Sequence, residues 1–342
     1  MNLSPFDLDV YGFLNAALTA LHWGFMNYVV FGTFAVLRRA AFRADESRLE
    51  TTLRDWLPFA WGGLITAGIG PLLFTQLVRP VRYGSAAALL QHSFMAILPV
   101  LILCFYLLYV LKGAHGPAAR IRRIVVSSAA FLGFLFIGWT MSRNHVLSLR
   151  PDLWADVYLG RAAPPDDAAR ARVLAWLSWA AGSFCAMAQW QLGRRELPSR
   201  GLAAAAIFAL HLAMPFTYRA VRITYGETDI PRIYVVFGVL GAGLQCLAWL
   251  AAFFGRNGPA VRACLPIGWL VSIATGAVFR EVLAVKREEL GPFGVETPPV
   301  LEATQGFPLF VISLTAVGAA CFVAVRIAAR AERSEPEPAP EP

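Results

Sequence analysis

The chain has 342 residues, of which 57% are hydrophobic and 15% are charged, and its formal net charge at pH 7 is +8. Soluble domains carry about 25% charged residues, so this composition excludes an ordinary soluble domain. The positive charge does not indicate nucleic-acid binding. With the N-terminus outside, the inner segments hold the whole excess of Lys and Arg, as the positive-inside rule requires.

Apolar stretches long enough to cross a bilayer, about 20 residues each, recur along the chain. They predict an all-α fold, a polytopic transmembrane bundle of about nine helices at 11–37, 56–78, 84–111, 121–142, 172–192, 201–218, 233–254, 263–280 and 306–328. Because the connections are short, residues 1–330 are expected to form a single bundle. The charge distribution places the N-terminus outside and the C-terminus in the cytoplasm, as in a multi-pass protein of a bacterial-type inner membrane.

Three segments lie outside these helices. The N-terminal segment MNLSPFDLDVYG is acidic and precedes no cleavage site, so the first helix is expected to act as its own insertion signal. The outer loop 143–171 is long enough to fold over the outer mouth, with Trp154 and Tyr158 at the interface. The acidic, Pro-rich tail at 331–342 is expected to be disordered in the cytoplasm.

Two histidines lie inside predicted helices. His22, in ALTALHWGFMNYVVFG, is about 16 Å from the outer end of the first helix at 1.5 Å per residue. His92, in ALLQHSFMAILPV, is about 12 Å inward from the outer end of the third helix. A neutral imidazole can be an axial ligand of haem iron, or can simply hydrogen-bond to a neighbouring helix. Two histidines at matching depth favour a cofactor.

Other polar residues in the apolar runs are weaker candidates for a functional role. Gln76, a buried amide late in the second helix, could orient a cofactor propionate or a quinone carbonyl, or make an interhelical hydrogen bond. His211, on the sixth helix, could be a ligand or a hydrogen-bonded residue. Glu281, at the outer end of the eighth helix, could ligate iron, accept a proton or pair with Arg280. His145 is expected to be a surface or interface residue at the outer mouth.

The five cysteines all lie in apolar runs and form no C-x-x-C pair. This pattern argues against covalent haem attachment, a zinc site and a disulfide framework. Buried, unreactive thiols are the expected role for these residues.

Several segments, in the same order along the chain, resemble subunit I of the cytochrome bd quinol oxidases, as a shortened and divergent relative. AALTALHW is similar to the family's A-L-T-x-x-x-H segment, and TAGIGPLLFTQLVRPVRYGSA to its T-G-x-x-x-E-F-Q-F-G-x-N-W stretch. GWTMSRNHVLSLRPDLWADVY resembles the region of N-G-W-M-Q-x-P, and PRIYVVFGVLG resembles R-I-M-V-G-L-G. IGWLVSIATGAVFREVLAVKRE resembles G-W-V-x-R-E-V-G-R-Q-P-W. Nine helices is also the family's count.

The resemblance implies that His22 ligates one active-site haem, that Glu281 ligates the second, and that Gln76 stands on the family's glutamine. The departures imply a changed function. The fifth helix lacks the histidine that holds the third haem, and Tyr234 replaces its methionine ligand. Only GRRELPSR stands where the family has its long quinol-binding loop.

The family's proton route is also changed. Its proton-channel glutamates on the third helix have no carboxylate counterpart, and His92 stands near the first of them. Ala284 replaces the arginine that follows the haem-ligating glutamate by three places. Oxygen reduction needs protons at an open iron coordination site, so the resemblance with these departures implies that oxygen-reductase activity is lost.

We therefore expect a membrane-embedded electron-transfer subunit of a respiratory complex, with one or two b-type haems. It would pass electrons between the quinone pool and a membrane or extracytoplasmic redox partner such as a cytochrome c. His22 and His92 would close one iron as a bis-histidine centre, which favours electron transfer over ligand activation. The alternatives are a cofactor-free membrane anchor or assembly subunit of a respiratory complex, and a transporter. No internal repeat supports a transporter.

Overall fold

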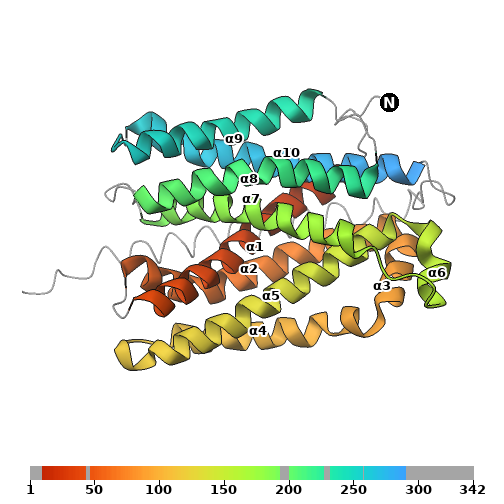
Figure 1. Ribbon diagram of the computed structural model, residues 1–342, viewed down its shortest axis with the longest axis horizontal. Helices are drawn as coiled ribbons and strands as arrows, with labels where there is room; N and C mark the ends of the chain where they lie inside the picture. Colours follow the sequence, from red (N-terminus) through yellow and green to blue (C-terminus); the bar gives the residue numbers. More distant parts are fainter. Residues whose placement is uncertain (1–9, 44–46, 193–199, 227–231, 257, 290–342) are drawn as a thin grey trace, which may run out of the picture. The chain divides into compact units, whose positions relative to one another are not determined.

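The computed structural model describes residues 10–43, 47–192, 200–226, 232–256 and 258–289, and no strand occurs in these ranges. The α-helices, shown in Figure 1, are α1 (Val10–Phe42), α2 (Arg48–Val78), α3 (Pro80–Met95), α4 (Ile97–Lys112), α5 (Arg120–Ser148), α6 (Trp154–Tyr158), α7 (Asp166–Leu192), α8 (Arg200–Tyr225), α9 (Arg232–Phe253) and α10 (Pro259–Glu289). The ninth predicted helix, at 306–328, and the tail at 331–342 lie outside the described residues.

Helix α1 is the element around which the other helices pack. It contacts α2, α5, α7 and α10, while α7 packs on α8, α9 on α10 and α4 on α5 (Figure 1). The largest core cluster includes Val29 of α1, Leu57 and Trp61 of α2, Leu108 of α4 and Phe134 of α5. The rings of Trp61 and Phe134 have centroids 5.0 Å apart. A central α1 means that residues on several of its faces lie inside the bundle.

Glycines on α2 allow α1 to approach closely. A Cβ atom at Gly63 would lie 2.7 Å from Phe25, and one at Gly70 would lie 2.6 Å from Leu18. Small residues at helix contacts are typical of membrane bundles, because close packing replaces the missing hydrophobic driving force. Larger side chains at these positions would push the two helices apart.

Six of the described helices are long and apolar enough to cross a membrane, and they indicate a multi-pass membrane protein. They are α1, α2, α5, α8, α9 and α10. The bent pair α3 and α4 makes a seventh candidate if it counts as one span. Helix α7, which contains the predicted fifth span, is not among the six, and its 27 residues include eight Ala but only three Leu, one Val and no Ile.

The predicted third helix, 84–111, is divided into two helices that meet at Ala96 with a bend of 43°. Pro99 explains the division, because a proline ring clashes with the carbonyl four residues earlier but is tolerated in the first turn of a new helix. Gln91, one turn before the break, has φ +38°, which is strained for a residue with a side chain. The break leaves His92 beside an irregular backbone.

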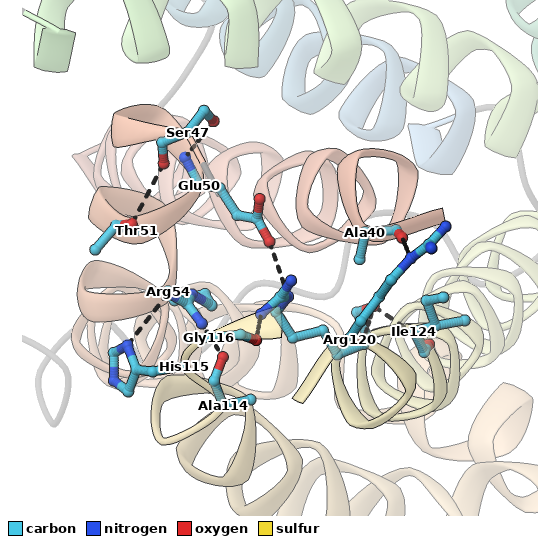
Figure 2. A network of polar contacts seen from close by, with 12 residues as sticks. Ala40, Ser47, Glu50, Thr51, Arg54, Ala114, His115, Gly116, Arg120 and Ile124 are labelled. Carbon is cyan, nitrogen blue, oxygen red and sulfur yellow. Dashed lines mark hydrogen bonds and ion pairs between the residues drawn. The ribbon is translucent and has the colours of Figure 1, made fainter. Parts of the chain in front are cut away.

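Buried charges tie the helices together at the end of the bundle that holds Glu50, which we call the Glu50 end (Figure 2). The Glu50 carboxylate is 3.2 Å from the Arg123 guanidinium, and both side chains are almost fully buried. Arg123 also donates to the Gly116 carbonyl at 2.8 Å. Arg54 donates to the Ala114 carbonyl and to His115 Nδ1. The network fastens the α4–α5 connection to α2.

Replacing Glu50 with Ala should destabilise the protein strongly. Removing one partner of a buried ion pair leaves an uncompensated charge, here that of Arg123, at a cost of about 3–5 kcal/mol. The thermal midpoint in detergent should therefore fall clearly. Asp55→Ala is the control, because Asp55 is an exposed carboxylate on the same helix. Equal midpoints for the two variants would contradict a stabilising role for the network.

Candidate functional site

A second group of polar residues lies at the other end of the bundle, which we call the Glu281 end. Its side chains come from α1, from the α2–α3 junction, and from α5, α7, α8 and α10. They are Asn15, Arg79, His145, Arg172, Tyr225, Arg280 and Glu281. These positions are far apart in the sequence and meet only because α1 is central. Ionisable residues inside a membrane bundle are expensive, which makes this end the first candidate for function.

Glu281 is the best-defined member of the group. Its side chain is buried, Oε1 accepts a hydrogen bond from Arg79 Nη2 at 2.6 Å, and Oε2 accepts one from Asn15 Nδ2 at 3.1 Å. The ion pair is therefore with Arg79, whereas pairing with Arg280 is one of three roles that the sequence leaves open for Glu281. Each oxygen accepts one hydrogen bond and keeps a second lone pair.

Arg280 is half-buried and makes no hydrogen bond or close ion pair with a described carboxylate. Its guanidinium lies 6.0 Å from the centroid of the Trp23 ring, within cation–π range. It interacts electrostatically with Glu281 most strongly, and also with Arg172, Tyr225 and Arg79. The Glu281 end is therefore rich in positive charge.

His145 belongs to this group; the sequence predicts a surface or interface residue at the outer mouth. Its Nε2 lies 3.2 Å from the Tyr225 hydroxyl, and the side chain is half-buried. Helix α5 continues to Ser148, six residues beyond the predicted end at 142, so His145 lies on the helix.

His22 lies between α1 and α2. Its Nδ1 is 3.0 Å from the Leu64 carbonyl oxygen. A carbonyl can only accept, so Nδ1 carries the hydrogen and Nε2 keeps its lone pair. No described residue hydrogen-bonds to Nε2. A backbone carbonyl fixing the second ring nitrogen is the usual arrangement around a metal-binding histidine.

Gly68 makes this position of the His22 ring possible. A Cβ atom at residue 68 would lie 2.7 Å from both Cε1 and Nδ1 of His22, closer than real Cβ contacts allow. The ring thus occupies the space that any other residue at position 68 would fill.

The other predicted site residues do not gather around His22. His92 is exposed on α3, His211 is exposed on α8, and Gln76, expected to be buried, is exposed near the end of α2. Among the described residues, no hydrogen bond or ring contact joins any of them to His22. The described residues also contain no group of three or more His, Cys, Asp or Glu side chains arranged to hold a metal ion.

Tyr234 occupies the place where the resemblance puts a haem-ligating methionine. The residue is buried, and its ring packs against Phe279 with centroids 4.8 Å apart. A tyrosine packed on a phenylalanine gives this position a role in the core of the Glu281 end.

The connection between α5 and α7 covers the side of the Glu281 end next to α3. Helix α6 packs on α3, and Trp154 donates its indole N–H to the Leu147 carbonyl at 2.9 Å. Arg150 makes hydrogen bonds of 2.7 to 3.1 Å to both carboxylate oxygens of Asp152, and these bonds raise the pKa of Arg150. Tyr158, expected at the interface together with Trp154, is largely exposed.

No protein-family model, no curated protein and no solved structure matches this chain. The resemblance to cytochrome bd subunit I therefore stays a prediction from the sequence motifs.

Glu281→Ala should lower the thermal midpoint in detergent, because it leaves Arg79 buried without its carboxylate. The expected cost is about 3–5 kcal/mol, as for other buried pairs. Asp167→Ala serves as the control, since the Asp167 side chain is 88% exposed and its pair with Arg170 is 3.6 Å long. Exposed pairs contribute about 0–1 kcal/mol, so this variant should unfold like the wild type. A wild-type midpoint for Glu281→Ala would contradict the stabilising pair.

Proposed function

We propose that the protein is a membrane-embedded electron-transfer subunit of a respiratory complex that binds a b-type haem through His22. It would exchange electrons between the quinone pool and a redox partner such as a cytochrome c, and it would not reduce oxygen. The observation that carries the proposal is the hydrogen bond from His22 Nδ1 to the Leu64 carbonyl. This bond leaves Nε2 with the lone pair that an iron ligand needs.

The surrounding residues fit such a group in their chemistry. His22 would hold the iron, Gly68 leaves room for the His22 ring, and the arginines of the Glu281 end suit the carboxylates of a porphyrin. A bound haem supplies one-electron redox chemistry, and the protein supplies its orientation and electrostatic surroundings. Glu281 holds Arg79 in place, a role that competes with ligation of a second haem iron.

The proposal also includes roles for three residues that are exposed in the structure. His92 remains the candidate for the second axial ligand, although its side chain is exposed on α3. Gln76 and His211, both exposed, remain candidates for contacts to a quinone or a cofactor.

We also propose that the bundle has nine spans, with the N-terminus outside and the C-terminus in the cytoplasm of a bacterial-type inner membrane. The Glu50 end would then face the cytoplasm and the Glu281 end the outside. Exposed arginines support this orientation, because Arg38, Arg43, Arg48 and Arg122 all lie at the Glu50 end.

A cofactor-free anchor or assembly subunit is the second candidate function. It is favoured by the exposure of His92 and by the complete pairing of the Glu281 carboxylate with Arg79 and Asn15. This alternative predicts a colourless purified protein that co-purifies with redox partners.

The purified protein should show a Soret band that shifts on reduction, and His22→Ala should abolish it because the axial ligand is lost. His115→Ala is the control, since His115 is an exposed histidine at the Glu50 end. His92→Ala tests the second ligand in the same spectrum. A Soret band of wild-type intensity in the His22→Ala protein would overturn the assignment of the ligand.

Gly68→Ala should reduce the haem-to-protein ratio several-fold, because the new methyl group occupies the place of the His22 ring. Gly62→Ala is a matched control on the same helix, where a Cβ atom meets nothing within 4 Å. Both changes raise helix propensity by about 1 kcal/mol, so propensity cannot explain a difference. Equal haem contents would contradict the claim that the position of the His22 ring beside Gly68 is needed for haem binding.

A further inference from the structure

The Glu281 end contains two guanidinium groups that have no hydrogen-bond acceptor among the described residues. Arg172, on the second turn of α7, and Arg280, near the end of α10, are half-buried and close enough to repel each other. Neither makes a hydrogen bond or an ion pair within 4.0 Å to any described residue. The Nε atom of Arg172 is buried without a hydrogen-bond partner.

Four of the described carboxylates at this end pair with arginines, and Asp156 of α6 is exposed. Glu281 pairs with Arg79 at 2.6 Å, and the remaining pairs are Asp152 with Arg150 at 2.7 Å, Asp166 with Arg143 at 2.9 Å, and Asp167 with Arg170 at 3.6 Å. Glu281 interacts electrostatically with Arg280, but its two oxygens already accept hydrogen bonds from Arg79 and Asn15. One buried carboxylate therefore stands against three guanidinium groups, those of Arg79, Arg172 and Arg280.

A further hydrogen-bond donor is buried at the same end of α5. The Asn144 side chain is 2% exposed, and its Nδ2 has no partner among the described residues. A buried amide N–H without an acceptor costs about 1–3 kcal/mol. Half-buried cations that lack an anion add to this cost, since they have lost water without gaining a counter-charge. An acceptor with negative charge would offset both costs.

We propose that Arg172 and Arg280 bind an oxyanion, a phosphate or carboxylate group carried by a membrane ligand. Guanidinium groups suit such ligands because they form two parallel hydrogen bonds to one oxyanion. The group could be the phosphate of an anionic phospholipid headgroup or a propionate of a haem. The haem source rests on the proposed function, whereas the phospholipid source is independent of it.

The test for the phospholipid source is the thermal midpoint of the delipidated full-length protein in detergent. Phosphatidylglycerol should raise the midpoint and phosphatidylcholine should not, because a ligand that binds only the folded state stabilises it. Arg172→Gln and Arg280→Gln should each weaken the apparent affinity for phosphatidylglycerol by about tenfold or more, as expected for a charged hydrogen bond. Arg170→Gln is the matched control, because Arg170 is an exposed residue of α7 two positions away.

The haem-to-protein ratio of the same variants tests the other source. If a propionate occupies the site, Arg172→Gln and Arg280→Gln should lower this ratio while Arg170→Gln keeps it, and phosphatidylglycerol should have no effect. Arg172→Lys keeps the charge but loses the paired hydrogen bonds, so it should be impaired in whichever assay responds, even if the glutamine variants fold poorly.

The proposal is overturned if all variants keep both the wild-type phosphatidylglycerol effect and the wild-type haem content. It is also overturned if the wild-type protein responds to neither ligand. The wild-type protein would respond to neither ligand if an acidic residue outside the described ranges balanced the charge of Arg172 and Arg280. The acidic residues in the neighbouring undescribed segments are Asp7, Asp9, Glu227 and Asp229. A colourless wild-type protein with an intact phosphatidylglycerol effect would remove the haem proposal and leave the oxyanion site standing.

Discussion

A charged side chain inside an apolar bundle is stable only when an opposite charge and hydrogen bonds replace the water that it has lost. In the described part of the chain, one buried ion pair at each end of the bundle meets this constraint. Glu50 and Arg123 join α2 to α5, and Arg79 and Glu281 join the α2–α3 junction to α10. Each pair connects elements that are distant in the sequence, so each also fixes how the helices are arranged around α1.

The two ends use this constraint differently. At the Glu50 end, Arg54 and Arg123 use carbonyls of the α4–α5 connection, so the charges serve to hold a loop (Figure 2). At the Glu281 end, the described arginines outnumber the one buried carboxylate, and His145 and Tyr225 add groups that can exchange protons. A structural role accounts for the first arrangement. The excess of donors in the second is what favours a ligand.

Much of the helical framework could be predicted because length and apolarity determine spans directly. Pro99 in the sequence could have indicated that the third helix is divided. The prediction missed the division because the residues on both sides of this proline are apolar. The partner of Glu281 could not be predicted, because Arg79 is about 200 residues away and only packing brings the two together. That His145 is half-buried and Gln76 is exposed depends on where each helix ends and on which face of the helix packs against its neighbours. Residue type alone does not specify either property.

The central claim is that the Nε2 atom of His22, left with its lone pair by the Leu64 carbonyl, binds a haem iron. Haem stoichiometry in the purified wild-type protein, measured as the pyridine haemochrome against protein concentration, tests it most directly. The account predicts a ratio of about one b-type haem per chain. A ratio near zero, in a protein that is folded and was expressed with haem available, would contradict it.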